Sequence, residues 1–170
     1  MHDEAHLTDP ATGSTGPTGD RRWADLADLV LIISREIQFR GYTDEQAIPL
    51  SPSEGMVMRY LQHDPAATPS RIATATGLQR TNLSAVLRGL EHKSLVERHA
   101  SPGDGRGVTV HPTELGRTNY TLVRQEWATA VSAAAGHDTS NLTAALTLLT
   151  AVENGLTTTR PQTRGARPAP

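Results

Sequence analysis

The sequence predicts a mainly α-helical fold that contains one small β-hairpin. Many of its apolar residues recur three or four positions apart, which is the period of an amphipathic helix. Ser51-Pro52 and Thr68-Pro69 each pair a capping residue with a proline, a combination that marks helix starts. Two short stretches alternate apolar and polar residues on either side of the glycine-rich run SPGDGRG, as the strands of a hairpin do.

Composition excludes several classes of protein. The 170 residues include no cysteine, which rules out disulfides, thiolate metal sites and cysteine nucleophiles. No apolar run approaches the roughly 20 residues that span a bilayer, and the acidic N-terminus does not resemble a signal peptide. We therefore expect a cytoplasmic protein with no membrane partner. The net charge is −2, but residues 50–112 hold seven basic against five acidic residues, which makes the middle mildly basic.

Apolar spacing and capping residues mark the first two helices. From Asp20 to Arg40 the apolar residues fall three or four apart, and Gly41 ends the predicted helix. Ser51 is then a natural N-cap, Pro52 suits the first helical position, and Glu54 completes a capping box. The expected buried stripe of this second helix is Met56 or Val57, followed by Tyr60 and Leu61.

Residues 69–88 have the spacing of a helix-turn-helix motif. Pro69 opens a short helix, and Gly77 can adopt the left-handed conformation that the turn needs. Ala73 supplies the small residue where the two helices touch. The apolar residues that would pin the second helix onto the first are Ile72, Leu78, Leu83 and Val86. Thr76 departs from the pattern, because an apolar residue is expected there.

The second helix of this motif carries a polar strip. Leu83, Val86 and Leu90 are expected to face inward, at about 100° per residue. The outward positions are then Thr81, Ser84, Ala85 and Arg88, flanked by Arg80 and Asn82. Arginine can donate twice to guanine and asparagine can pair with adenine in a major groove, while hydroxyls such as that of Ser70 can hold phosphates. The alternative interpretation is an ordinary polar helix surface.

The glycine-rich tip between the two strands carries one base and one acid. A glycine-flanked Arg106 can project into a narrow minor groove, where the negative potential is strongest. Asp104 can hold the guanidinium of Arg106 extended through charge-assisted hydrogen bonds. The alternative is a solvent-exposed turn with a weak ion pair. Next to a helix-turn-helix, we interpret this hairpin as a DNA-binding wing.

Two further helices are predicted after the hairpin. Thr113 caps a long helix whose apolar positions include Leu115, Leu122, Trp127 and Val131. A last helix spans about Ser140 to Leu156, with Leu142, Leu146, Leu149 and Val152 aligned. The expected organisation is a disordered tail (1–19), an N-terminal dimerisation helix (20–48), a winged helix-turn-helix domain (49–112), C-terminal dimerisation helices (113–156) and a second disordered tail (157–170).

The segment from LSPSEGMVMRYL through TNLSAVLRGLEHKSLVERHASPGDGRGVTVHPTELGR resembles the winged helix-turn-helix core of the MarR family of bacterial transcriptional regulators. It carries the family's wing pattern at Asp104, Arg106, Val108, Val110, Thr113 and Gly116. Three positions depart from the family pattern. Ser94 stands where a helix-ending glycine is usual, and Pro112 stands where an apolar residue is usual. Gln79 is a poor N-cap at a position where serine is common.

The resemblance implies an obligate homodimer that binds a pseudo-palindromic operator in double-stranded DNA. Each recognition helix and wing would read one half-site. Family members commonly repress nearby genes, and a small, often phenolic or anionic, ligand can release the DNA. Exposed apolar stripes on the terminal helices would be compatible with dimerisation. The predicted function is therefore a homodimeric, ligand-responsive repressor without a cofactor.

Other functions find less support in the residues. The seven histidines are scattered and show no metal-ligand spacing. No phosphate loop, nucleophile elbow or clustered acid pair indicates an enzyme. Tyr60, Tyr120 and Trp127 are candidates for an effector pocket, although aromatics at such spacings are usually core residues. The alternative function is a winged-helix module that binds another protein, but Arg88, Arg106 and the hydroxyl strip stand where such a module needs an apolar surface.

Overall fold

The computed structural model describes residues 21–100 and 107–161. The chain forms two compact units, residues 1–36 and residues 37–170. The first contains most of helix α1 (Arg21–Phe39), which confirms the predicted N-terminal helix. No residue of α1 is buried, and its exposed large apolar side chains include Trp23, Leu31 and Ile32.

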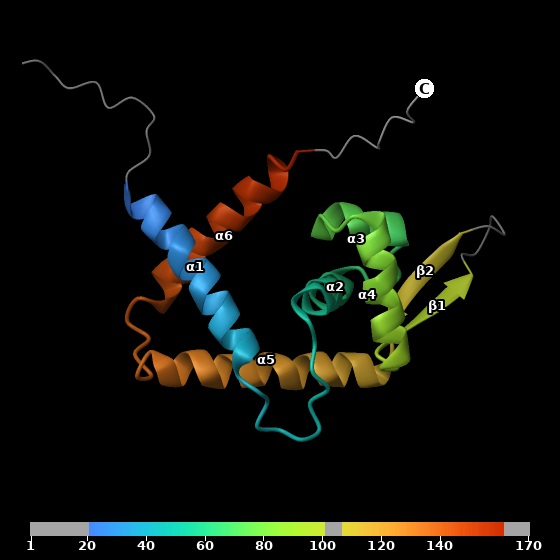
Figure 1. Ribbon diagram of the computed structural model, residues 1–170, viewed down its shortest axis with the longest axis horizontal. Helices are drawn as coiled ribbons and strands as arrows, with labels where there is room; N and C mark the ends of the chain where they lie inside the picture. Colours follow the sequence, from blue (N-terminus) through green and yellow to red (C-terminus); the bar gives the residue numbers. More distant parts are fainter. Residues whose placement is uncertain (1–20, 101–106, 162–170) are drawn as a thin grey trace, which may run out of the picture. The chain divides into compact units, whose positions relative to one another are not determined.

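The second unit contains the remaining elements in the predicted order (Figure 1). They are α2 (Pro52–His63), α3 (Pro69–Thr76), α4 (Arg80–His92), β1 (Val96–Ala100), β2 (Val108–Pro112), α5 (Glu114–Ala134) and α6 (Leu142–Thr158). Five helices and one antiparallel hairpin thus follow α1 within the described residues, and the predicted fold class is confirmed.

Helix α2 lies at the centre of this unit, in contact with α3, α4, α5 and β2. Its capping box is complete: Ser51 Oγ accepts the Glu54 N–H at 3.3 Å, and Glu54 Oε2 accepts the Ser51 N–H at 2.7 Å. The buried stripe contains Val57 and not Met56, which is 43% exposed. The core is aliphatic, as the low aromatic content requires, and comprises chiefly Val57, Met58, Leu61, Ile72, Leu83, Leu87, Leu90, Leu95 and Val110.

The hairpin is joined to the core by a third extended segment. Val96 pairs with Pro112 and Ala100 with Val108 in the β1–β2 register. On the other edge of β2, the Val110 N–H donates to the Ala67 carbonyl at 2.9 Å. Val110 and Ala67 are both fully buried, so this bridge seats the hairpin against the start of α3.

The long helix α5 begins at the predicted N-cap, Thr113, whose Oγ1 accepts the Gly116 N–H at 2.9 Å. Of the apolar positions that mark this helix in the sequence, Leu115 and Val131 are 46% and 45% exposed. The residues buried instead are Gly116, Asn119, Tyr120 and Val123. Asn119 is buried because its amide bonds both backbone groups of Ile48, donating to the carbonyl and accepting from the N–H.

Helix α6 is shifted by two residues from its expected start and end. It begins at Leu142 and continues to Thr158, so residues 157 and 158, which the sequence placed in a disordered tail, are helical. None of its residues is buried, and its exposed leucines are Leu142, Leu146, Leu148, Leu149 and Leu156. In the described ranges, no helix is long and apolar enough to span a lipid bilayer.

Candidate nucleic-acid interface

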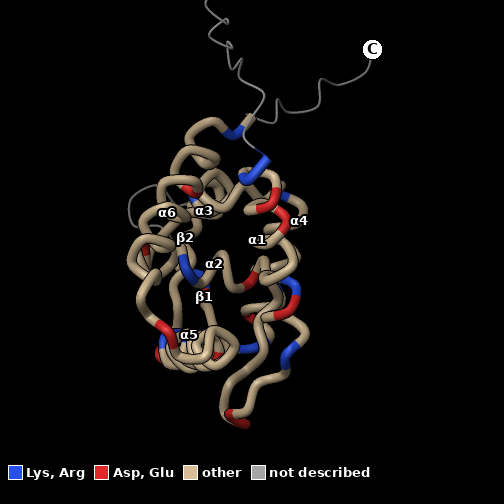
Figure 2. The backbone as a smooth tube through the Cα atoms, turned by 90° about the vertical axis from the view of Figure 1, so that its left-hand side faces the viewer, with Lys and Arg blue, Asp and Glu red and all other residues tan. Residues whose placement is uncertain are grey.

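Helix α4 is held by one face and exposes the other, as its sequence predicted. Leu83, Leu87 and Leu90 are buried against the core, and Val86 is half-buried beside them. The exposed residues on the rest of the helix include every predicted outward position: Arg80, Thr81, Asn82, Ser84, Ala85 and Arg88. Seen along the backbone, basic and acidic residues are interspersed (Figure 2). The chain as a whole therefore does not indicate where DNA would bind, and the case for α4 depends on its own exposed side chains.

The turn before α4 has the predicted geometry, including a role for the unexpected Thr76. Gly77 lies in the left-handed region, with φ 74°, and its N–H donates to the Ala73 carbonyl at 2.8 Å. Thr76 is buried, and its hydroxyl donates to the Ile72 carbonyl at 2.7 Å while accepting from the Leu78 N–H at 3.4 Å. A hydroxyl serves here because it accepts from the Leu78 N–H in the turn, which an apolar side chain could not do.

The two arginines of α4 differ from the other cations around the motif. Arg71, Lys93 and Arg98 are bound to Asp64, Glu54 and Glu91 at 2.9, 2.7 and 2.7 Å respectively. Arg80 and Arg88 have no ion pair and no side-chain hydrogen bond with any part of the chain that the structure describes. Both are exposed, so their donors are available to a ligand.

The predicted hydroxyls are exposed as well. Ser70 lies at the start of α3, and Thr81 and Ser84 lie on α4. Ser84 Oγ donates to the Arg80 carbonyl at 2.9 Å, which leaves its oxygen lone pairs free to accept. Gln79 makes no side-chain capping bond, as expected of a poor N-cap.

Of the wing, the structure describes the strands. Asp104 and Arg106, the predicted charged pair at the tip, lie outside the described residues. Arg98 on β1 donates from Nε and Nη2 to Glu91, which fixes the strand to the end of α4.

A histidine pair on the wing was not predicted. The rings of His99 and His111 stack with centroids 4.4 Å apart, and His99 Nε2 lies 2.9 Å from Glu97 Oε1. Only the strand register brings these histidines together, and spacing along the sequence gave no signal of it. No group of three metal-ligating side chains occurs within residues 21–100 and 107–161.

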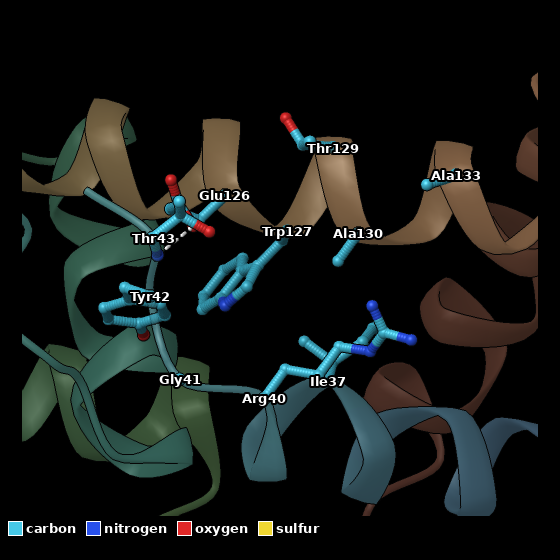
Figure 3. A pocket seen from close by; sticks show the side chains of 10 residues that line it. All are labelled: Ile37, Arg40, Gly41, Tyr42, Thr43, Glu126, Trp127, Thr129, Ala130 and Ala133. Atoms are coloured by element: carbon cyan, nitrogen blue, oxygen red, sulfur yellow. Dashed lines mark hydrogen bonds between the residues drawn. The ribbon is translucent and has the colours of Figure 1, made fainter.

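A pocket of about 370 Å³ lies between α5 and residues 37–43 (Figure 3). Trp127, one of three aromatics proposed for an effector pocket, lines it together with Ile37, Arg40, Tyr42, Glu126 and Ala130. Glu126 accepts the backbone N–H groups of Thr43 and Asp44 at 2.8 and 3.3 Å, which holds the loop beside the opening.

The other two aromatic candidates do not line this pocket. Tyr120 is 6% exposed, and Tyr60 packs against the same core. The Tyr60 hydroxyl donates to Asp64 Oδ2 at 2.9 Å. Burial, and then this hydrogen bond, raise the pKa of the Tyr60 phenol. Both side chains are therefore structural residues of the core.

A short helix, a glycine turn, an exposed second helix and an antiparallel hairpin together define a winged helix-turn-helix domain. Residues 48–107 match the model of the MarR family. An HTH-type transcriptional regulator of Mycobacterium tuberculosis is 29% identical over 107 residues, which cover 61% of this chain and 72% of the relative. Over these residues the chain is therefore similar to MarR-family transcriptional regulators.

Solved structures show the same fold. The transcriptional repressor CouR bound to a 23-mer DNA duplex is 25% identical, with a TM-score of 0.52 over 78% of this chain and 87% of that one. BpsR of Bordetella bronchiseptica, whose DNA binding is regulated by 6-hydroxynicotinic acid, is 19% identical, with a TM-score of 0.56 over 76% of this chain and 98% of that one. These similarities agree with the mainly helical fold and its hairpin.

Proposed function

We propose that this protein is a homodimeric, sequence-specific repressor that binds a pseudo-palindromic operator and releases it when a small ligand binds. The observation that carries the proposal is the exposed strip of α4, on which Arg80 and Arg88 have no partner among the described residues. A DNA-bound repressor of similar fold, CouR, supports the same conclusion.

Helix α4 suits a major groove by its chemistry. Arg80 and Arg88 are eight residues apart, so about 12 Å separates them along the helix axis. Between them the exposed side chains are small or polar, so the helix can approach base edges closely. Either arginine can donate twice to a guanine, and Asn82 can pair with an adenine. Ser70, Thr81 and Ser84 add hydroxyls for phosphate oxygens.

The dimer is inferred from the terminal helices. Neither α1 nor α6 buries a single residue, yet each exposes several large apolar side chains. On α6, Leu142, Leu146 and Leu149 recur at helical spacing and are 50%, 58% and 39% exposed. A second copy of the chain would cover such stripes, and two copies related by a two-fold axis match a pseudo-palindromic site.

We propose that the ligand binds in the pocket beside α5. Arg40 supplies a cation, and Trp127 and Tyr42 supply aromatic faces, which suits a small phenolic or anionic compound. Residues 40–43 also lead into the segment before α2, so a ligand held there can act on the DNA-binding domain through the backbone.

The test is operator binding by α4 variants. Arg80→Ala and Arg88→Ala are each expected to weaken binding to duplexes selected from a random pool by about 10-fold to 100-fold. The matched control is Arg124→Ala, which removes an exposed cation from α5. An equal effect of all three substitutions would refute the assignment of α4 as the reading helix.

The wing is tested separately by Arg106→Ala. This substitution is expected to cost on the order of 1–3 kcal/mol in operator binding and to leave the dimer folded. Unchanged affinity would contradict the wing assignment. Wild-type binding should weaken steeply as salt rises, because phosphate contacts release counterions. A flat salt response would favour a module that binds another protein.

A further inference from the structure

Arg160, just beyond the end of α6, contacts the helix-turn-helix motif. Its Nη1 donates to the carbonyl oxygens of Thr74 and Ala75 at 3.2 and 3.3 Å. The side chain comes from a C-terminal stretch that contains three arginines and no acid, where a solvated cation would be the simplest expectation. Arg160 is instead partly buried against the end of α3.

The two carbonyls need an external donor. The last four carbonyls of a helix have no partner within it, and Thr74 and Ala75 belong to this group in α3. The Gly77 N–H is used by Ala73, and the Leu78 N–H turns to the Thr76 hydroxyl. A guanidinium fits this place because it donates hydrogen bonds and its charge is favourable at the negative end of the helix dipole.

The same guanidinium lies against Gly77, the turn residue. A Cβ added to Gly77 would be 2.6 Å from both Cζ and Nη1 of Arg160. Gly77 is favoured for its left-handed conformation, and a side chain at this position would also displace the Arg160 guanidinium from the turn. The guanidinium that donates the two hydrogen bonds therefore also lies on the link between α3 and α4.

Helix α6 is held to this domain by charged contacts. Besides Arg160, Glu153 of α6 forms an ion pair with Arg59 of α2, with Nη1 and Oε1 2.8 Å apart. No α6 residue is buried, so these two contacts fix the helix where apolar packing does not. Of the two, only Arg160 touches the turn that precedes the recognition helix.

We propose that Arg160 is a positioning residue that sets the place of the α3–α4 turn relative to α6, and thereby the spacing between the two recognition helices of the dimer. This inference rests on the proposed function. If α6 lies at the dimer interface, its end is fixed relative to the two-fold axis. A contact from that end to the turn then fixes the position of α4 relative to the two-fold axis. The distance between the two copies of α4 sets the spacing of the half-sites that the dimer can bind.

The first experiment measures spacing preference. Duplexes selected with the wild-type protein are remade with one or two base pairs added or removed between the half-sites, and affinity is measured for each. Arg160→Ala is expected to weaken binding to the best spacing by about fivefold to tenfold and to flatten the preference among spacings. The matched control is Arg164→Ala, which removes the same charge four residues further along the chain and is expected to keep the preference.

The salt dependence distinguishes positioning from a phosphate contact. A cation that binds phosphate lowers the slope of log affinity against log salt by about 1 when removed. Arg160→Ala is expected to keep the wild-type slope, because its guanidinium is occupied by α3 carbonyls. A lower slope with an unchanged spacing preference would overturn the proposal, as would unchanged affinity at every spacing.

The second experiment needs no DNA. Amide hydrogen exchange at Gly77 and Leu78 is expected to be several-fold faster in Arg160→Ala than in wild type or Arg164→Ala, because the turn loses its external support. Equal exchange in all three proteins would overturn the proposal. If the wild type binds no duplex, the proposed function fails, and this measurement still decides whether Arg160 holds the turn.

Discussion

The ammonium of Lys93 lies 2.7 Å from the Oε2 atom of Glu54, and this pair joins the residue that ends α4 to the first turn of α2. Glu54 is nearly buried, and the same oxygen also accepts the Ser51 N–H of the capping box. Lys93 donates in addition to the Pro49 carbonyl at 2.8 Å. One carboxylate thus caps the start of α2 and holds the end of α4.

Glu54→Ala is expected to lower the free energy of unfolding by about 3–5 kcal/mol, because it leaves a partly buried ammonium and a capping N–H without their partner. Urea unfolding followed by circular dichroism measures the change. The matched control is Glu114→Ala, which breaks the exposed ion pair with Arg117 and should cost less than about 1 kcal/mol. Similar losses of stability in both variants would show that the nearly buried Glu54–Lys93 pair stabilises the protein no more than the exposed pair does.

Two helical glycines should respond oppositely to alanine. A Cβ at Gly116 would collide with the carbonyl oxygen of Leu95, which is fixed because it accepts the Thr113 N–H at 3.1 Å. Gly116→Ala is therefore expected to cost at least about 3 kcal/mol of stability. Gly155 has nothing within 4 Å of such a Cβ, so Gly155→Ala should gain up to about 1 kcal/mol from helix propensity.

Thermal unfolding of both glycine variants at one protein concentration tests this contrast. A tolerated Gly116→Ala would mean that the α5 start can move away from Leu95. A destabilising Gly155→Ala would instead indicate that a second copy of the chain contacts this side of α6.

Replacing Ser94 with glycine is expected to stabilise the protein. It has φ 57°, a left-handed conformation that costs a residue with a side chain about 1 kcal/mol. Ser94→Gly should therefore raise the unfolding free energy by up to about 1 kcal/mol, offset partly by the greater freedom of the unfolded chain. The backbone contact of the Ser94 carbonyl with Thr113 Oγ1 stays in place. Ser94→Ala keeps the strained conformation, so a gain of equal size in that variant would disprove the explanation.

Local features of the fold could be predicted from the sequence because their causes lie within a few residues. The caps at Ser51, Thr68 and Thr113 and the left-handed Gly77 were all expected and are all present. The exposed face of α4 also followed from helical periodicity alone. Thr76 departed from the expected pattern because the sequence does not show that its hydroxyl accepts from the Leu78 N–H in the folded turn.

Features that depend on distant partners could not be predicted. Arg59 and Arg88 look alike in sequence, yet one is paired with Glu153, 94 residues away, and the other has no described partner. The residues that α5 buries could not be predicted for a similar reason. Leu115 is exposed, while Asn119 is buried because Ile48, 71 residues away, supplies its hydrogen bonds. Periodicity indicates that a helix has a buried side. It does not predict that a polar residue is buried when its hydrogen-bond partners lie far away in the sequence.

Alkaline pH should destabilise the protein through its core tyrosines. Burial raises the pKa of the Tyr120 phenol, against smaller opposing effects of Arg124 and Arg59. The folded state therefore keeps the Tyr120 proton to higher pH than the unfolded chain does. The associated stability is fully present below the unfolded pKa of about 10 and is lost as pH rises through the folded value. Tyr60, whose pKa is raised in the same direction, adds to this loss.

Tyr120→Phe is expected to reduce the alkaline loss, since the variant has one fewer buried phenol to ionise. Urea midpoints at pH 8 and at pH values from about 10 upward give the comparison, because the phenol is protonated in both states at the lower pH. Tyr42→Phe, which keeps both core tyrosines, should lose stability with pH as the wild type does. An alkaline loss of the same size in Tyr120→Phe as in Tyr42→Phe would show that Tyr120 ionises as easily in the folded protein as in the unfolded chain.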